Sequence, residues 1–109
     1  MTVSILGTEY TIEERTPAED AYLKECDGYC DKTSKLIVID NSPDDSELDN
    51  YEAYRQKTLR HEIIHAFLFE SGLQENFTHP KMGHDELYVD WIAVQFPKIL
   101  EAFKKVGCI

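Results

Sequence analysis

Hydrophobic and polar positions follow different repeats in the two halves of the chain. Residues 8–13 alternate between polar and apolar side chains, as expected for a strand with one buried face. Residues 35–40 form a run of mostly β-branched residues, typical of a strand covered on at least one face. Turn-forming residues precede that run, so Tyr29 and Cys30 are expected to pair with it as the short strand of a hairpin. The first half therefore predicts a small β-sheet.

The second half carries a helical repeat that starts near residue 48 and ends near residue 71. One face of this segment has residues at spacings of three or four: Tyr54, Thr58, His61, His65 and Leu68. Ser42, followed by Pro43 and several acids, has the composition of a helix start, and Gly72 provides a stop.

A second helix is predicted to follow a polar loop at residues 74–83. It covers about residues 85–96, and Pro97 either breaks or kinks it before residues 98–105 continue as helix. Strands followed by helices indicate an α+β fold. At 109 residues, the chain is expected to form one domain covering residues 1–109.

Charge and cysteine content narrow the class of protein. The net charge of −10 argues against nucleic acid or an anionic membrane as partner, because both would repel the chain. Residues 1–7 have neither the basic region nor the apolar run of a signal peptide, and no apolar run is long enough to span a membrane, so neither kind of segment is expected. Three cysteines are too few for a disulfide framework and fit a reducing cytoplasm, so Cys26 and Cys30 are interpreted as free thiols.

The strongest chemical motif is His61-Glu62-Ile63-Ile64-His65, in the middle of the first predicted helix. Two histidines four residues apart lie about 40° apart around a helix and about 6 Å apart along it. Both can therefore reach one Zn²⁺ ion, and Glu62 lies beside the metal, where it can take a proton from zinc-bound water. The alternative is a histidine pair without metal, which would need hydrogen-bond partners to be buried.

Zinc needs a third protein ligand, and the second predicted helix offers Glu86 and Asp90 on one face. The economical assignment places Glu86 on the metal and Asp90 in a hydrogen bond to the far nitrogen of His61 or His65. The alternative is that both acids only occupy the exposed face and the first turn of the helix, where they suit the helix dipole.

Three more residues compete for roles near the metal. His84 could be a ligand if the second helix starts earlier, and His79 is a rival too. One of His79, His84 and Tyr88 is expected to line the cleft, where a donor could stabilise the oxyanion of a tetrahedral intermediate. The sequence does not choose among them.

The two helical motifs together resemble the gluzincin group of zinc metallopeptidases, and within it the ImmA/IrrE-type family. The resemblance rests on the His61–His65 motif, on the segment Glu86-Leu87-Tyr88-Val89-Asp90-Trp91-Ile92-Ala93, and on Pro97 after it. It implies a zincin-like fold, with a small N-terminal sheet packed on the active-site helix and a C-terminal helix that carries the glutamate ligand. It also implies intracellular proteolysis of substrates such as transcriptional repressors, and it is similar to compact versions encoded by phages and prophages of Gram-positive bacteria.

The leading hypothesis is thus a cytoplasmic hydrolase, a zinc-dependent metalloprotease that binds its substrate along an edge strand near Cys30 or residues 37–39. One alternative is a zinc-binding interaction module that keeps the zincin fold and binds a partner without cutting it. Another is a zinc hydrolase that does not act on peptides.

Overall fold

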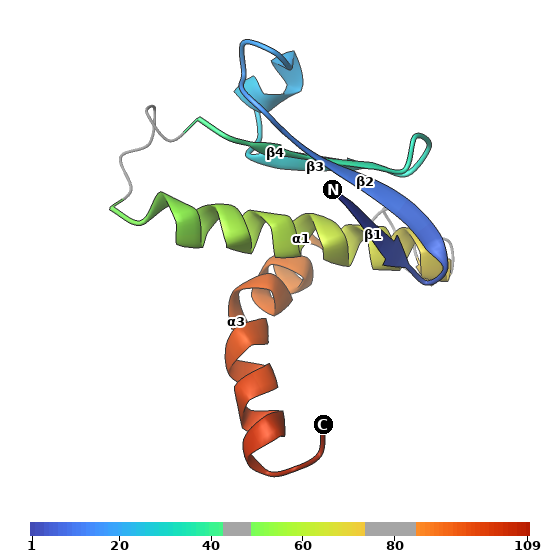
Figure 1. Cartoon of the computed structure of the whole chain (residues 1–109), viewed down its shortest axis with the longest axis vertical. Helices are drawn as coiled ribbons and strands as arrows, with labels where there is room; N and C mark the ends of the chain where they lie inside the picture. Colours follow the sequence, from blue (N-terminus) through green and yellow to red (C-terminus); the bar gives the residue numbers. More distant parts are fainter. Residues whose placement is uncertain (43–48, 74–84) are drawn as a thin grey trace.

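The structure is a computed structural model that describes residues 1–42, 49–73 and 85–109. Figure 1 shows an α+β arrangement in which a four-stranded sheet packs on one helix and a second helix lies against the far side of the first. The sequence prediction of an α+β fold is confirmed. The elements are β1 (Thr2–Ile5), β2 (Thr8–Arg15), the 3-10 helix η1 (Ala21–Lys24), β3 (Gly28–Asp31), β4 (Leu36–Asp40), α1 (Tyr51–Ser71) and α3 (Glu86–Lys105).

The sheet has the strand order β1-β2-β4-β3. β2 and β4 are parallel, whereas the outer pairs β1–β2 and β3–β4 are antiparallel. The predicted hairpin partner of β4 is therefore present as β3, in which Cys30 pairs with Ile37. Because β4 is paired on both sides, the alternative that residues 37–39 supply a free edge is wrong. β3 is the edge strand that contains Cys30.

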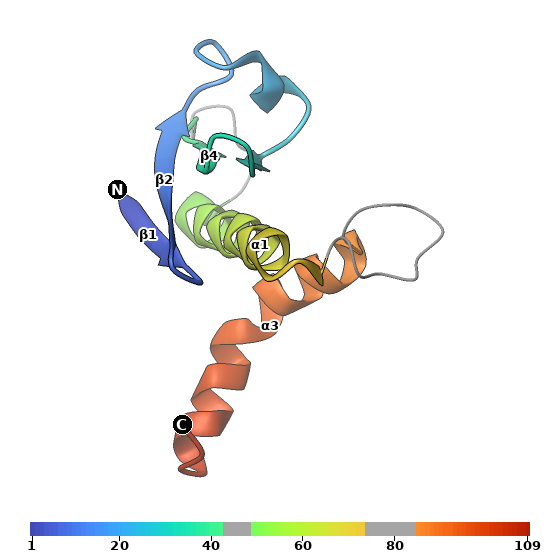
Figure 2. The ribbon, with the colours of Figure 1, turned by 90° about the vertical axis from the view of Figure 1, so that its right-hand side faces the viewer.

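The core lies between the sheet and α1. Ile5, Tyr10 and Ile37 are fully buried there together with Ile39 and Ala66. Ile5 belongs to β1, a strand of only four residues that the sequence pattern did not predict. Successive side chains of β4 point to opposite faces of the sheet, so Val38 lies on the face away from α1. It is also buried there, on the side of the sheet where Figures 1 and 2 show η1.

Glu70 of α1 fastens the helix to the sheet. Its Oε1 accepts hydrogen bonds from the hydroxyl of Tyr10 at 2.7 Å and from Nζ of Lys35 at 2.6 Å. Its Oε2 accepts a hydrogen bond from Oγ1 of Thr8 at 3.1 Å. The Lys35 ammonium, followed by Tyr10, holds the pKa of Glu70 below its usual value. These contacts fix the position along the sheet of the helix that carries the histidines.

α1 starts later than the sequence pattern predicts. Its N-cap is Asn50, whose side chain accepts a hydrogen bond from the backbone N–H of Ala53 at 3.1 Å. The expected start next to Pro43 falls on residues 43–48, outside the described residues. The predicted stop is confirmed, since Gly72 ends the helix at φ +77°, a left-handed conformation that favours glycine.

α3 is one helix from Glu86 to Lys105, so Pro97 does not break it. Asp85 caps its start by accepting from the N–H of Leu87 at 3.0 Å. Figure 2 shows that the axis of α3 changes direction along its length, as expected for a helix with an internal proline. No helix in the described ranges is both long and apolar enough to cross a membrane.

Candidate metal centre

Three side chains from two helices converge on one point. His61 and His65 lie one turn apart on α1, and their Nε2 atoms are 3.1 Å apart. Glu86, in the first turn of α3, places Oε2 at 3.1 Å from Nε2 of His61 and Oε1 at 2.9 Å from Nε2 of His65. The described residues therefore contain a His-His-Glu group that could hold a metal ion.

The geometry of this group fits a small divalent ion. In tetrahedral coordination at about 2.0–2.1 Å, the donor atoms stand about 3.3 Å apart, close to the separations observed here. Neutral imidazoles and a carboxylate are donors that zinc prefers. The Glu86 side chain is 68% exposed, whereas those of His61 and His65 are 16% and 11% exposed. A bound ion would thus have the two histidines on its buried side and would be open to solvent on the side of Glu86.

Asp90, one turn after Glu86 on α3, orients one of the histidines. Its Oδ1 lies 3.3 Å from Nδ1 of His61 and 3.2 Å from Nζ of Lys57. When Nδ1 of His61 donates its proton to this carboxylate, the lone pair on Nε2 faces His65 and Glu86, which is the arrangement that can bind a metal. Burial opposes ionisation of Asp90, but its bonds to Lys57 and His61 hold its pKa below the usual value.

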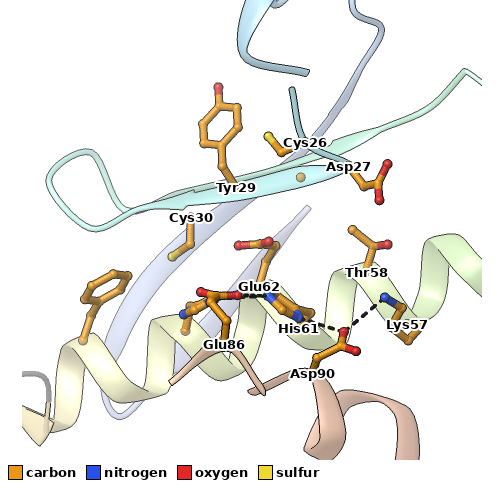
Figure 3. Close-up of a pocket in the computed structure, with 13 residues that line it drawn as sticks. Cys26, Asp27, Tyr29, Cys30, Lys57, Thr58, His61, Glu62, Glu86 and Asp90 are labelled. Atoms are coloured by element: carbon orange, nitrogen blue, oxygen red, sulfur yellow. Dashed lines mark hydrogen bonds and ion pairs between the residues drawn. The ribbon is translucent and has the colours of Figure 1, made fainter. Parts of the chain in front are cut away.

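Glu62 is buried beside the histidines. It is only 7% exposed, and none of the described residues donates a hydrogen bond to its carboxylate. Figure 3 shows its side chain pointing from α1 toward β3. Burial first, and then the nearby charge of Glu86, raise the pKa of Glu62 to about 7, while Lys57 opposes the rise. A carboxyl group in such a position is suited to exchange a proton with a group in the cavity.

These side chains face one cavity of about 610 Å³ between β3 and the two helices. Figure 3 shows β3 on one side of it and α1 on the other. Thirteen residues line it: Cys26, Asp27, Gly28, Tyr29, Cys30, Lys57, Thr58, His61, Glu62, His65, Phe69, Glu86 and Asp90. Cys26 and Cys30 are free thiols, as predicted. Burial raises the pKa of the Cys30 thiol to about 12, which keeps it protonated near neutral pH.

The structure brings together some of the predicted site residues and not others. His61, Glu62, His65, Glu86 and Asp90 all line the cavity. Tyr88 is 65% exposed and is not among the lining residues. His79 and His84 lie outside the described residues, so neither of their expected roles can be placed.

Lys57 is a residue of the site that sequence reasoning missed. It lies one turn before His61 on α1, with Nζ 3.2 Å from Asp90 and 5.0 Å from the centre of the Tyr54 ring. Its i,i+4 spacing from His61 was the available signal. A lysine at that spacing is common on a solvated helix, so only the packing of α3 shows that it faces the site.

Comparison with known proteins does not identify a family for this chain. No protein-family model, curated protein or solved structure matches the chain. The function is therefore inferred from the residues of the site.

Proposed function

We propose that this protein is a zinc-dependent metallopeptidase with a zincin-like fold. The observation that carries the proposal is Glu62, a buried carboxyl group without a hydrogen-bond partner among the described residues, next to a His-His-Glu group that fits a metal. Burial of an unpaired carboxyl group is costly, so a purely structural role does not explain Glu62. A general base next to a metal-bound water does.

The residues divide the chemistry as follows. His61, His65 and Glu86 would hold zinc, which supplies a water of lowered pKa and polarises the peptide carbonyl. Glu62 takes a proton from the attacking water and passes it to the leaving amine nitrogen. Asp90 keeps the ring of His61 in the tautomer that leaves Nε2 free to bind.

The free edge of β3 suits the binding of an extended peptide. Among the described residues, β3 pairs with β4 on one side only, and residues 26–30 line the cavity next to the candidate metal ligands. A peptide added to this edge would form main-chain hydrogen bonds and pass across the site. The resemblance to ImmA/IrrE-type metallopeptidases supports an intracellular protein substrate in the cytoplasm, such as a transcriptional repressor.

The proposal is tested by metal analysis and by cleavage assays on the zinc-loaded chain. We expect one zinc per chain, lost or weakened in His65→Ala and Glu86→Ala. A Glu62→Gln variant should keep zinc and lose cleavage of a peptide library, whereas Glu101→Gln, an exposed change on α3, should leave both unchanged. Cleavage by Glu62→Gln at the wild-type rate would contradict the mechanism.

A zinc-binding interaction module is the second candidate. It is favoured if the fourth coordination position is taken by a protein side chain, because structural zinc sites are closed whereas catalytic sites keep a place for water. X-ray absorption spectroscopy of the zinc-loaded chain distinguishes the two. A shell of protein ligands only, together with no cleavage by the wild type, would support the module.

A further inference from the structure

The wall of the cavity formed by β3 carries an acid that the proposed mechanism does not use. Asp27 lies directly before β3 and lines the cavity with its neighbours. Figure 3 shows it on the β3 side, across from Thr58 and Lys57 of α1. Asp27 is exposed, so its carboxylate is accessible from solvent.

The other charged groups of the cavity wall are already engaged. Glu86 and Asp90 contact the histidines, and Lys57 is paired with Asp90 at 3.2 Å. Glu62 is the buried base. Asp27, by contrast, accepts a hydrogen bond from the neutral hydroxyl of Tyr54 and contacts no cation among the described residues. Its negative charge is therefore uncompensated at the edge of the site.

Asp27 is also held in place before any ligand binds. Its carbonyl accepts a hydrogen bond from the N–H of Asp40 at 2.9 Å, and its side chain is fixed by Tyr54. Gly28, the next residue, packs so closely on α1 that an added Cβ would lie 3.2 Å from Cγ2 of Thr58. A carboxylate that is ordered in advance loses little freedom when it binds a cation.

The position of Asp27 relative to the metal ligands follows from α1. Gly28 lies beside Thr58, which precedes His61 by three residues, or about 4.5 Å along the helix axis. Asp27 is one strand residue, about 3.3 Å, farther from His61, on the side of Tyr54. An extended peptide also advances about 3.3 Å per residue, so a side chain opposite Asp27 belongs to a residue about two to three positions from the bond at the metal.

We propose that Asp27 selects substrates that carry lysine or arginine within about three residues of the scissile bond. This inference rests on the proposed peptidase function. The net charge of the chain, −10, favours the approach of the same class of basic segment and disfavours an acidic one. The pairing is solvent-exposed, so the preference it creates is modest, about two- to fivefold in kcat/KM.

The test is a cleavage-site profile of the zinc-loaded full chain on a mixture of unstructured peptides, read by mass spectrometry. We expect lysine and arginine to be enriched at one position near the cut in the wild type and not in Asp27→Asn. Paired peptides that differ only by lysine or glutamine at that position then give the ratio of kcat/KM. Tyr54→Phe is the second variant, because it releases the carboxylate without removing it and should weaken the preference in part.

Asp31→Asn is the matched control. Asp31 ends the same strand, but its carboxylate accepts hydrogen bonds from Thr33 and Ser34 in its own turn, so its substitution should leave the preference intact. Cleavage without a preference for basic residues, or an equal preference in Asp27→Asn, would overturn the inference and leave the peptidase function standing. No cleavage by the zinc-loaded wild type would contradict the peptidase function itself, and the selection of substrates would fall with it.

Discussion

Nε of Arg60 on α1 donates a hydrogen bond to the carbonyl oxygen of Ala93 on α3 at 2.7 Å. Ala93 lies four residues before Pro97, so its carbonyl is the one that the missing N–H of proline leaves without a helical partner. Arg60 thus supplies the hydrogen-bond donor that the carbonyl oxygen of Ala93 lacks because residue 97 is proline. The contact also joins the helix of the histidines to the helix of Glu86.

A double-mutant cycle tests this relationship. Arg60→Ala should lower the free energy of unfolding by about 1.5–3 kcal/mol, because a hydrogen bond from a charged donor is lost and the carbonyl is left unpaired. In a Pro97→Ala background the new N–H of residue 97 can bond to Ala93, so the same change should cost less. Urea unfolding of the four proteins gives the coupling energy. Equal costs in both backgrounds would show that Arg60 acts independently of the proline.

Asp90 and Lys57 are expected to control metal affinity without binding the metal. Asp90→Ala removes the acceptor that orients the His61 ring, and zinc affinity should fall about 10- to 100-fold. Lys57→Met keeps the apolar stem and should cause a smaller loss, because only the support of Asp90 is removed. Competition with a chromophoric chelator measures both. Lys98→Met, an exposed change on α3, is the control. Unchanged affinity in Asp90→Ala would contradict the orienting role.

Gly28 lets β3 lie close to both β4 and α1. A Cβ at this position would lie 2.8 Å from the carbonyl oxygen of Val38 and 3.1 Å from Cδ1 of Ile39. The nearest atom is backbone, so β3 must shift, and Gly28→Ala should lower the free energy of unfolding by about 1–3 kcal/mol. Thermal or urea unfolding measures this cost. Gly7→Ala is not a suitable control, since its φ of +87° strains alanine without any crowding. Wild-type stability for Gly28→Ala would show that β3 can move freely.

Asp31 should stabilise the folded chain near neutral pH, and this contribution should be lost in acid. Hydrogen bonds to its carboxylate, first from the Thr33 side chain and then from the Thr33 N–H, lower its pKa to about 2 from the usual value of 3.8. A lowered pKa means that the folded state favours the charged form. The stabilisation is therefore complete above pH 3.8 and is lost as the pH falls toward 2.

The measurement is the urea midpoint of the wild type and of Asp31→Asn at steps between pH 5 and pH 2. Asparagine keeps an acceptor for the turn but does not titrate. The midpoint of the wild type should fall more steeply below pH 4 than that of the variant. Parallel curves would mean that Asp31 contributes nothing to acid sensitivity.

The sequence by itself determined the elements that local patterns specify. The two helices, the strand at residues 36–40 and the stop at Gly72 all follow from periodicity, β-branching and the conformational freedom of glycine. The spacing of His61 and His65 also follows from helix geometry alone, because residues four apart share a face in any helix. These features depend on neighbours in the chain, and so they could be predicted without knowledge of packing.

Tertiary structure decided everything that depends on how the elements meet. β1 is too short for its pattern to stand out, and it is stabilised by long-range contacts, the pairing with β2 and the burial of Ile5. The pattern could not tell whether β3 or β4 lies at the edge, since strand order is set by long-range pairing. The meeting of Glu86 with His61 and His65, the role of Lys57 and the exclusion of Tyr88 from the cavity arise from the crossing of α3 over α1. Side-chain packing sets that crossing, and residues 25 positions apart carry no local mark of their contact.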